Sequence, residues 1–208
     1  MYIPKYSSIT DLEFLKLFIL NHSFGTLVNS SKNELSANHY PFLLTEDNGE
    51  IVLWTHLARN NPQWQELSRE QCMVIFTGPQ AYISPSYYIN NLNVPTWNYT
   101  AVHAKCEAEV ISDNDLEKEL MKKMVQFYEN RNQTNWNYNL PEGFHEKLLK
   151  AIVWIKLKVI SLDGKFKLSQ NREQVDYDNL TQILSSKKSD NEKELLKYMK
   201  LTNPFQEL

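Results

Sequence analysis

The stretch TLVNSSKNELSANHYPFLLTEDNGEIVLWTHL, residues 26–57, decides the fold class. Its short apolar segments are separated by turn residues, and Asp47-Asn48-Gly49 is a hairpin signal between two of them. The segment QCMVIFTG, residues 71–78, continues the pattern up to Gly78-Pro79, where we expect the strand to break. This part of the chain therefore predicts antiparallel strands joined by hairpins.

Helix signals flank these strands and interrupt them. Thr10-Asp11-Leu12-Glu13 has the form of a capping box, so Thr10 is predicted to cap a helix that runs to about Ile19. Asn60-Asn61-Pro62 predicts the start of a short helix, because Asn caps helices and Pro tolerates the first turn. Ser112 is predicted to cap a longer helix, and Pro141 to start another. The longer helix has one apolar face, made of Leu116, Leu120, Met124 and Phe127.

Two more strands are predicted at residues 100–111 and 152–160, the second from apolar residues that alternate with Trp and Lys. After Asp163-Gly164 comes KFKLSQNR, and a polar amphipathic tail follows it. We therefore expect a barrel domain over residues 1–172 and a helical extension over 173–208, packed on the barrel or trailing from it.

These elements predict an α+β fold that is mostly β, with about six antiparallel strands and peripheral helices. A closed barrel leaves no exposed strand edges, which favours a barrel over a sandwich. At 208 residues the chain is long enough for one well-buried core.

The composition excludes several classes of protein. The net charge of −3 and the pI of about 6.0 give no overall attraction to a phosphate backbone. No apolar stretch is long enough to span a bilayer and the first residues do not resemble a signal peptide, so we expect a cytoplasmic protein. Cys72 and Cys106 each lie in a strand-like apolar segment, which favours buried thiols over a disulfide or a catalytic role.

No catalytic constellation is visible in the sequence. The five histidines lie far apart without metal-ligand spacing. The motifs of serine hydrolases, P-loop proteins and dinucleotide-binding folds are absent. We therefore expect neither a metal site nor a catalytic residue.

Six blocks of this chain stand in a characteristic order and spacing. The blocks are NHSFGTLV (21–28), ANHYPFLL (37–44), WTHLARNNPQW (54–64), FTGPQAYISPSYY (76–88), PTWNYTAVHA (95–104) and GKFKLSQNR (164–172). They resemble the signature blocks of the PaiB-like family of FMN-binding negative transcriptional regulators, and the resemblance runs from Met1 to about Arg172. The resemblance implies a split β-barrel related to the pyridoxamine-phosphate-oxidase-like flavoproteins, with FMN at the interface of a homodimer.

The turn after the strand that ends in Thr55-His56 is the predicted phosphate site. It passes through Arg59 and Asn60 into a helix N-terminus, where free amides and the helix dipole favour an anion. Arg59 is the best phosphate ligand, although a solvated Arg beside an Asn cap explains the same residues. Related flavoproteins carry a basic pair here; Asn60 replaces the second cation, and His56 or a lysine could compensate.

The resemblance places the strand ANHYPFLL along the flavin ring and contributes four predicted contacts. Asn38 and Phe42 share one face of this strand with Tyr40, whereas His39 and Pro41 share the other. The alternative is an ordinary edge strand with a surface histidine, since Pro41 removes one hydrogen bond of the ladder.

Two later blocks complete the predicted flavin site. PTWNY offers a stacking surface and amide donors from Trp97, Asn98 and Tyr99, or equally a packed aromatic corner. KFKLSQ carries two cations on one strand face, followed by two polar residues. The alternative interpretation is a strand edge whose lysines face solvent. The residues of this last block are Lys165, Lys167, Ser169 and Gln170, which by resemblance reach the flavin, across the dimer interface in one arrangement.

Three functions fit the sequence. The first is an FMN-binding regulator, although direct DNA binding is not supported by charge or motif. The second is an FMN-dependent oxidoreductase on a small cytosolic substrate, with residues 82–97 as a lid. The third is a binding module for FMN or a haem-related ligand.

Overall fold

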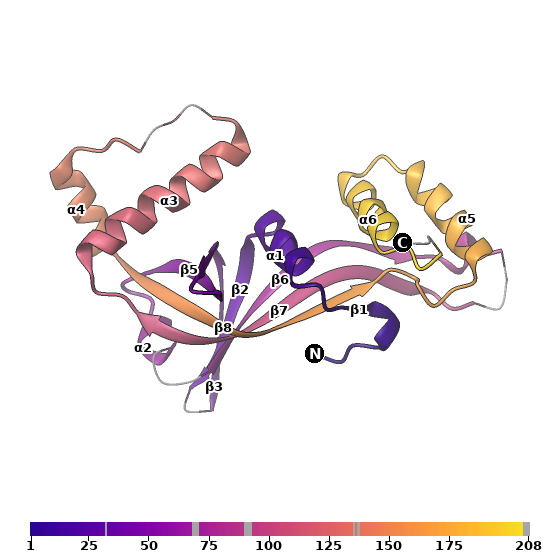
Figure 1. Cartoon of the computed structure of the whole chain (residues 1–208), viewed down its shortest axis with the longest axis horizontal. Helices are drawn as coiled ribbons and strands as arrows, with labels where there is room; N and C mark the ends of the chain where they lie inside the picture. Colours follow the sequence, from indigo (N-terminus) through magenta and orange to yellow (C-terminus); the bar gives the residue numbers. More distant parts are fainter. Residues whose placement is uncertain (32, 68–70, 90–92, 135, 137, 206–208) are drawn as a thin grey trace. The chain divides into compact units, whose positions relative to one another are not determined.

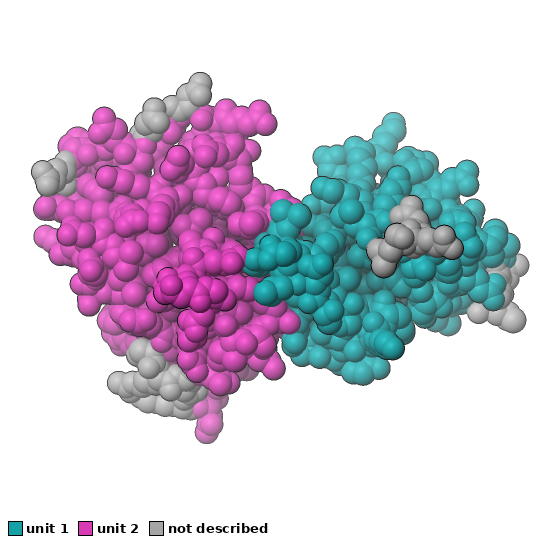
Figure 2. Space-filling model, viewed as in Figure 1, with its two compact units in different colours: residues 1–18, 77–102, 163–208 teal, residues 19–76, 103–162 magenta. Residues whose placement is uncertain are grey.

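The computed structural model describes residues 1–31, 33–67, 71–89, 93–134, 136 and 138–205. The chain forms two compact units, which Figure 2 shows in teal and magenta. Unit 1 comprises residues 1–18, 77–102 and 163–208, and unit 2 comprises residues 19–76 and 103–162. Each unit is therefore built from segments that lie far apart in the sequence.

Eight strands form one sheet with the order β3-β2-β6-β7-β8-β5-β4, and β1 pairs with β8 (Figure 1). The pairings β2–β3, β2–β6, β4–β5, β5–β8 and β1–β8 are antiparallel, as predicted. The bounds are β1 Ser8–Ile9, β2 Phe24–Ser31, β3 Glu34–Pro41, β4 Leu43–Asp47, β5 Glu50–Ala58, β6 Gln71–Ile83, β7 Thr96–Val110 and β8 Ile152–Lys167.

Helices follow the predicted order, with two caps shifted by one residue. Asp11, not Thr10, caps α1 by accepting a bond of 2.9 Å from the Phe14 amide. Asp113, not Ser112, caps α3 through the amides of Asp115 and Leu116. No helix in the described ranges is long and apolar enough to cross a membrane. The bounds are α1 Leu12–Asn21, α2 Gln63–Leu67, α3 Asn114–Asn132, α4 Glu142–Lys150, α5 Gln174–Ser185 and α6 Asp190–Leu201, with short 3-10 turns at Lys5–Ser7 and Pro85–Tyr87.

A bend at Phe42 divides the segment that was predicted as one strand. Pro41 has no amide hydrogen to extend the ladder, and the Phe42 amide donates instead to the Ser23 carbonyl at 2.8 Å. The Phe42 ring is buried and meets the Phe76 ring edge-on at 5.4 Å. The strand order begins with β3 and ends with β4, so these two ends are joined covalently through the bend.

The core of unit 1 explains why the predicted strand break at Gly78-Pro79 is wrong. β6 continues through Gly78-Pro79 and β8 continues through Asp163-Gly164. A Cβ on Gly78 would overlap Thr100 and lie 2.8 Å from Phe18, and one on Gly164 would overlap Leu15. These glycines are therefore sites of close helix–strand packing inside strands.

Aromatic rings and the C-terminal helices fill the rest of unit 1. Phe18 and Tyr198 pack against Phe166 with ring centroids 5.0 and 5.5 Å apart. The helices α5 and α6 lie side by side (Figure 1), and the Tyr177 hydroxyl donates to the Met199 carbonyl at 2.6 Å. Burial raises the pKa of Tyr177 to about 12.

Unit 2 contains a second hydrophobic core beneath α3. Trp54 and Trp154 pack there with Leu120 and Met124, and Leu116 and Phe127 flank them, so the predicted apolar face of α3 is confirmed. Cys72 and Cys106 are free and buried, also as predicted. Burial raises the pKa of Cys72 to about 12, which makes its thiol a poor nucleophile.

Candidate functional site

The predicted flavin-site residues fall into one group in each unit. Unit 1 holds the groups from β7 and from the end of β8, and unit 2 holds those from β3, β5 and the turn before α2. Each group is a local arrangement with its own hydrogen bonds.

The unit 1 group is built around the cations Lys165, Lys167 and Arg172. Lys167 donates to the Thr96 hydroxyl and, at 2.6 Å, to the Trp97 carbonyl. Burial, Lys165 and Arg172 lower the pKa of Lys167, in that order of size. None of the three cations has an ion pair with a carboxylate of the described residues. This cluster therefore carries positive charge that an anion would neutralise.

Buried polar side chains fix the backbone beside this cluster. Asn98 is fully buried and donates to the Ser169 hydroxyl at 3.0 Å, and Tyr88 lies 3.3 Å from the same oxygen. Ser169 has a φ of 66°, a left-handed conformation that this network holds in place. Gln170 closes the turn by accepting from the Leu168 amide and donating to the Phe166 carbonyl.

Aromatic rings surround the same cations. Trp97 is 54% exposed and meets the Tyr82 ring at 6.1 Å. Lys165 lies over the Tyr99 ring at 5.4 Å, and Arg172 lies over the Tyr88 ring at 4.6 Å. Exposed rings beside cations suit a ligand that has both a flat ring and an anionic group.

Arg172 was not among the predicted site residues, although it ends the sixth sequence block. Its guanidinium donates to the Asn93 side chain and stacks on Tyr88. The signal was the basic residue five positions after Lys167, but sequence spacing did not show that the turn at Ser169 brings the two together.

Arg59 in unit 2 is held by the backbone. Its Nε donates to the Lys150 carbonyl and its Nη2 to the Ile152 carbonyl, both at 2.7 Å. These bonds join the turn after β5 to the end of α4 and the start of β8. Nη1 makes no hydrogen bond with any described residue, so it keeps donors for an anion.

The strand predicted to lie along the flavin ring is bonded to α2. Asn38 and Tyr40 donate to the Gln63 side-chain oxygen at 3.0 and 2.9 Å, so they share a face as predicted. Asn61 caps α2 at the Gln63 amide and donates to Tyr40. His39 points to the other face, where it is exposed and stacks on Phe24 at 6.3 Å.

The remaining predicted residues of unit 2 differ in accessibility. Thr55 is fully buried and donates to the Pro41 carbonyl at 2.8 Å, which links β5 to the bend. His56 packs on Trp154 at 5.0 Å; its Nδ1 is buried without a partner, and burial lowers the pKa of the imidazole. Asn60 is exposed in the turn.

The unit 1 cluster fits the chemical demands of FMN best. The FMN phosphate needs cationic donors, which Lys165, Lys167 and Arg172 offer, and its ring needs an aromatic or apolar surface such as Trp97. No group of three His, Cys, Asp or Glu side chains in the described residues is arranged to hold a metal ion.

Comparisons with known proteins support FMN as the cofactor. A family model described as "Putative FMN-binding domain" matches residues 1–161. "Protease synthase and sporulation protein PAI 2" of Bacillus subtilis (strain 168) is 36% identical over 201 residues, which cover 96% of each chain.

Solved structures show the same fold at low sequence identity. The flavocytochrome Anf3 from Azotobacter vinelandii gives a TM-score of 0.61 at 13% identity over 85% of this chain and 78% of that one. The FAD and heme binding protein from Mycobacterium smegmatis gives 0.60 at 15% identity over 77% and 73%. The predicted mostly-β split-barrel type of fold is therefore confirmed.

Proposed function

This chain belongs to the FMN-binding, PaiB-like family, and from that membership we propose that it is a flavin-dependent regulator that works as a homodimer. FMN is its cofactor. When bound, FMN supplies redox chemistry through its ring, and the protein supplies binding and orientation.

The observation that carries the site is the unpaired positive charge of unit 1. Lys165, Lys167 and Arg172 would bind the FMN phosphate, because a dianion offsets the burial and the mutual repulsion that together lower the pKa of Lys167. Trp97 would contact the ring. Arg59 of the partner subunit would add a phosphate contact through Nη1.

A homodimer is supported by an uncovered sheet face of unit 2, here called the β2–β3 face. Thr26 pairs with His39 and Val28 with Ala37, which places these side chains on one side. Leu35 and Phe24, at 80% and 63% exposed, extend the same face. Contiguous exposed apolar side chains of this kind mark interaction surfaces.

The experiment is to identify the bound ligand and measure its affinity. Freshly purified protein should be yellow and release a ligand with the mass of FMN. Lys167→Gln should weaken FMN binding about ten- to hundred-fold in a fluorescence titration, because a charge-assisted bond is lost. Lys200→Gln, at an exposed position of α6, should leave the dissociation constant unchanged.

Two outcomes would change the proposal. An unchanged FMN dissociation constant for Lys167→Gln would remove the unit 1 cluster from the site. Bleaching of the flavin by a nicotinamide cofactor, followed by reoxidation with a small substrate, would replace the regulator with an oxidoreductase.

A further inference from the structure

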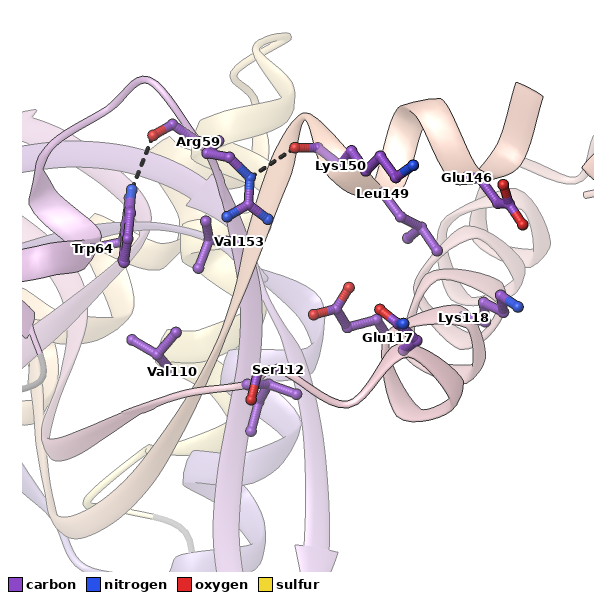
Figure 3. A pocket seen from close by; sticks show the side chains of 12 residues that line it. Arg59, Trp64, Val110, Ser112, Glu117, Lys118, Glu146, Leu149, Lys150 and Val153 are labelled. Atoms are coloured by element: carbon purple, nitrogen blue, oxygen red, sulfur yellow. Dashed lines mark hydrogen bonds between the residues drawn. The ribbon is translucent and has the colours of Figure 1, made fainter. Parts of the chain in front are cut away.

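Unit 2 contains a cavity of about 460 Å³. Arg59 lines this cavity, whereas Lys165, Lys167, Arg172 and Trp97 do not. Figure 3 shows its walls, which come from the turn after β5, the end of β7, the first turns of α3 and the last turns of α4. Its volume lies in the range of small-molecule sites. Charged and apolar side chains line it, among them Arg59, Val110, Glu117, Lys118, Leu149 and Lys150.

Glu117 is the unusual residue of this cavity. Its side chain is on α3, the residue is only 8% exposed, and its carboxylate points into the cavity (Figure 3). It forms no hydrogen bond or ion pair with any described residue. Burial raises the pKa of Glu117, an effect that nearby Arg59 opposes and Asp113 reinforces. A carboxylate that faces a cavity and has no bonded partner is available to pair with a cationic ligand group.

The wall opposite Glu117 is cationic because it carries Arg59. The Arg59 guanidinium, fixed by its two carbonyl bonds, faces Glu117 across the gap (Figure 3). Lys118, next to Glu117 on α3, and Lys150, at the end of α4, also line the cavity, without ion pairs to described carboxylates. The exposed Glu146 of α4 lines it as a second carboxylate. If Arg59 contacts a flavin phosphate, these lysines still provide positive charge. Val110 and Leu149 give the cavity apolar surface between its charged walls.

This distribution of charge discriminates between ligand classes. A simple anion would satisfy the cationic wall but would leave Glu117 unpaired and would be repelled by it. A simple amine would pair with Glu117 but would leave Arg59, on the opposite wall, without an anionic partner. Only a ligand with both charges satisfies both walls.

We propose that this cavity binds a small zwitterion of the α-amino-acid type. Its ammonium group pairs with Glu117, its carboxylate pairs with the cationic wall, and its apolar side chain packs on Val110 and Leu149. The cavity is thus a second ligand site, separate from the unit 1 cluster that holds the flavin phosphate.

The first test varies the ligand. Isothermal titration calorimetry at pH 7 would use L-leucine, L-methionine and L-phenylalanine, each beside its N-acetyl and its amide derivative. At least one free amino acid should bind, and blocking either charged end should weaken binding ten-fold or more. No heat from any of the three, or equal affinity for the N-acetyl form, overturns the proposal.

The second test varies the protein. Glu117→Gln keeps the size of the side chain and should weaken binding of the same amino acid ten-fold or more. Glu119→Gln is the matched control, since Glu119 lies on the exposed side of α3 and pairs with Lys123 at 2.5 Å. Equal affinity of wild type and Glu117→Gln overturns the assignment.

Two further measurements distinguish a loss of amino-acid binding from a loss of stability and from a loss of flavin binding. Glu117→Gln removes a charge that has no bonded partner among the described residues, so its melting temperature without ligand should not fall, and the amino acid should raise the melting temperature of wild type more than that of the variant. The same variant should keep the FMN dissociation constant of wild type. Failure of the zwitterion site would therefore leave the flavin proposal untouched, and the reverse holds as well.

Discussion

Unit 1 and unit 2 use similar residues in opposite ways. In unit 1, Lys165, Lys167 and Arg172 lie close together without an ion pair to a described carboxylate. In unit 2, Arg59 donates two of its hydrogen bonds to backbone carbonyls. In unit 1, α1 packs so closely on the sheet that strand glycines are needed, whereas unit 2 leaves the β2–β3 face uncovered.

The difference shows that residue type alone does not assign a role. A lysine whose pKa is lowered by burial and by neighbouring cations favours an anionic ligand, whereas an arginine bonded to backbone carbonyls of α4 and β8 first serves the fold. Likewise, a glycine within a β-strand can mark a break or a close contact, and only the neighbouring side chains distinguish the two.

The largest expected effect concerns the uncovered face. Ala37→Lys places a charge at an exposed position in the middle of the β2–β3 face, opposite Val28. Association of two subunits through this face should lose about 2 to 4 kcal/mol, because a lysine would be desolvated there without a partner. Sedimentation equilibrium should show monomers for this variant and dimers for the control Leu201→Lys, at an exposed position of α6. A dimeric Ala37→Lys protein would place the interface elsewhere.

A smaller effect tests the close packing of unit 1. Gly78→Ala should lower the free energy of unfolding by about 1 to 3 kcal/mol, because its Cβ would press on Phe18 and Thr100. Gly143→Ala is the contrasting variant in unit 2, where nothing lies within 4 Å of the added Cβ. There the better helix propensity of Ala should stabilise the protein by up to about 1 kcal/mol. Urea denaturation of both variants measures the difference, and equal stabilities would contradict the packing argument.

The smallest effect separates the two roles of Arg59. Arg59→Ala should weaken FMN binding about ten-fold through loss of the Nη1 contact, and should cost about 1 to 2 kcal/mol of stability. Arg131 is a matched control in the same unit, since its guanidinium donates to the Leu20 and Asn21 carbonyls at the end of α1. Arg131→Ala should lose similar stability and retain FMN affinity. The same affinity in both variants would leave Arg59 with its structural role alone.

Much of the fold could be predicted because its signals are local. The Asp47-Asn48-Gly49 hairpin, the cap at Asn61 and the apolar face of α3 each follow from a few neighbouring residues. The family could also be predicted, because six sequence blocks in the same order rarely match by chance.

The wrong predictions concern residues whose role depends on distant parts of the chain. Gly78 indicates a strand break when only its sequence neighbours are considered, but Phe18 of α1 and Thr100 of β7 determine its actual role. The bend at Phe42 depends on the Ser23 carbonyl, which lies far earlier in the chain, just before β2. Asp11 and Asp113 displaced Thr10 and Ser112 as caps, since an ionised carboxylate accepts amide bonds more strongly than a hydroxyl does.

The sequence blocks of the candidate site could be predicted, but the positions of their side chains relative to one another could not. The blocks around Trp97 and Lys165 do form one cluster, joined by the bond from Asn98 to Ser169. Arg172 and Glu117 were missed, because the first depends on a left-handed turn and the second on a cavity between helices. Which predicted residues touch FMN stays a prediction.

The strands β6, β7 and β8 each contribute residues to both units, so no single cut in the polypeptide separates one unit from the other. A fragment that ends at residue 162 would lack the last strand segment of unit 1, together with Phe166 and the helices α5 and α6. Dissection of this protein by truncation is therefore ruled out by its connectivity. Point substitutions, or splitting the chain in a loop and co-expressing both pieces, are the routes by which each half can be studied in its native surroundings.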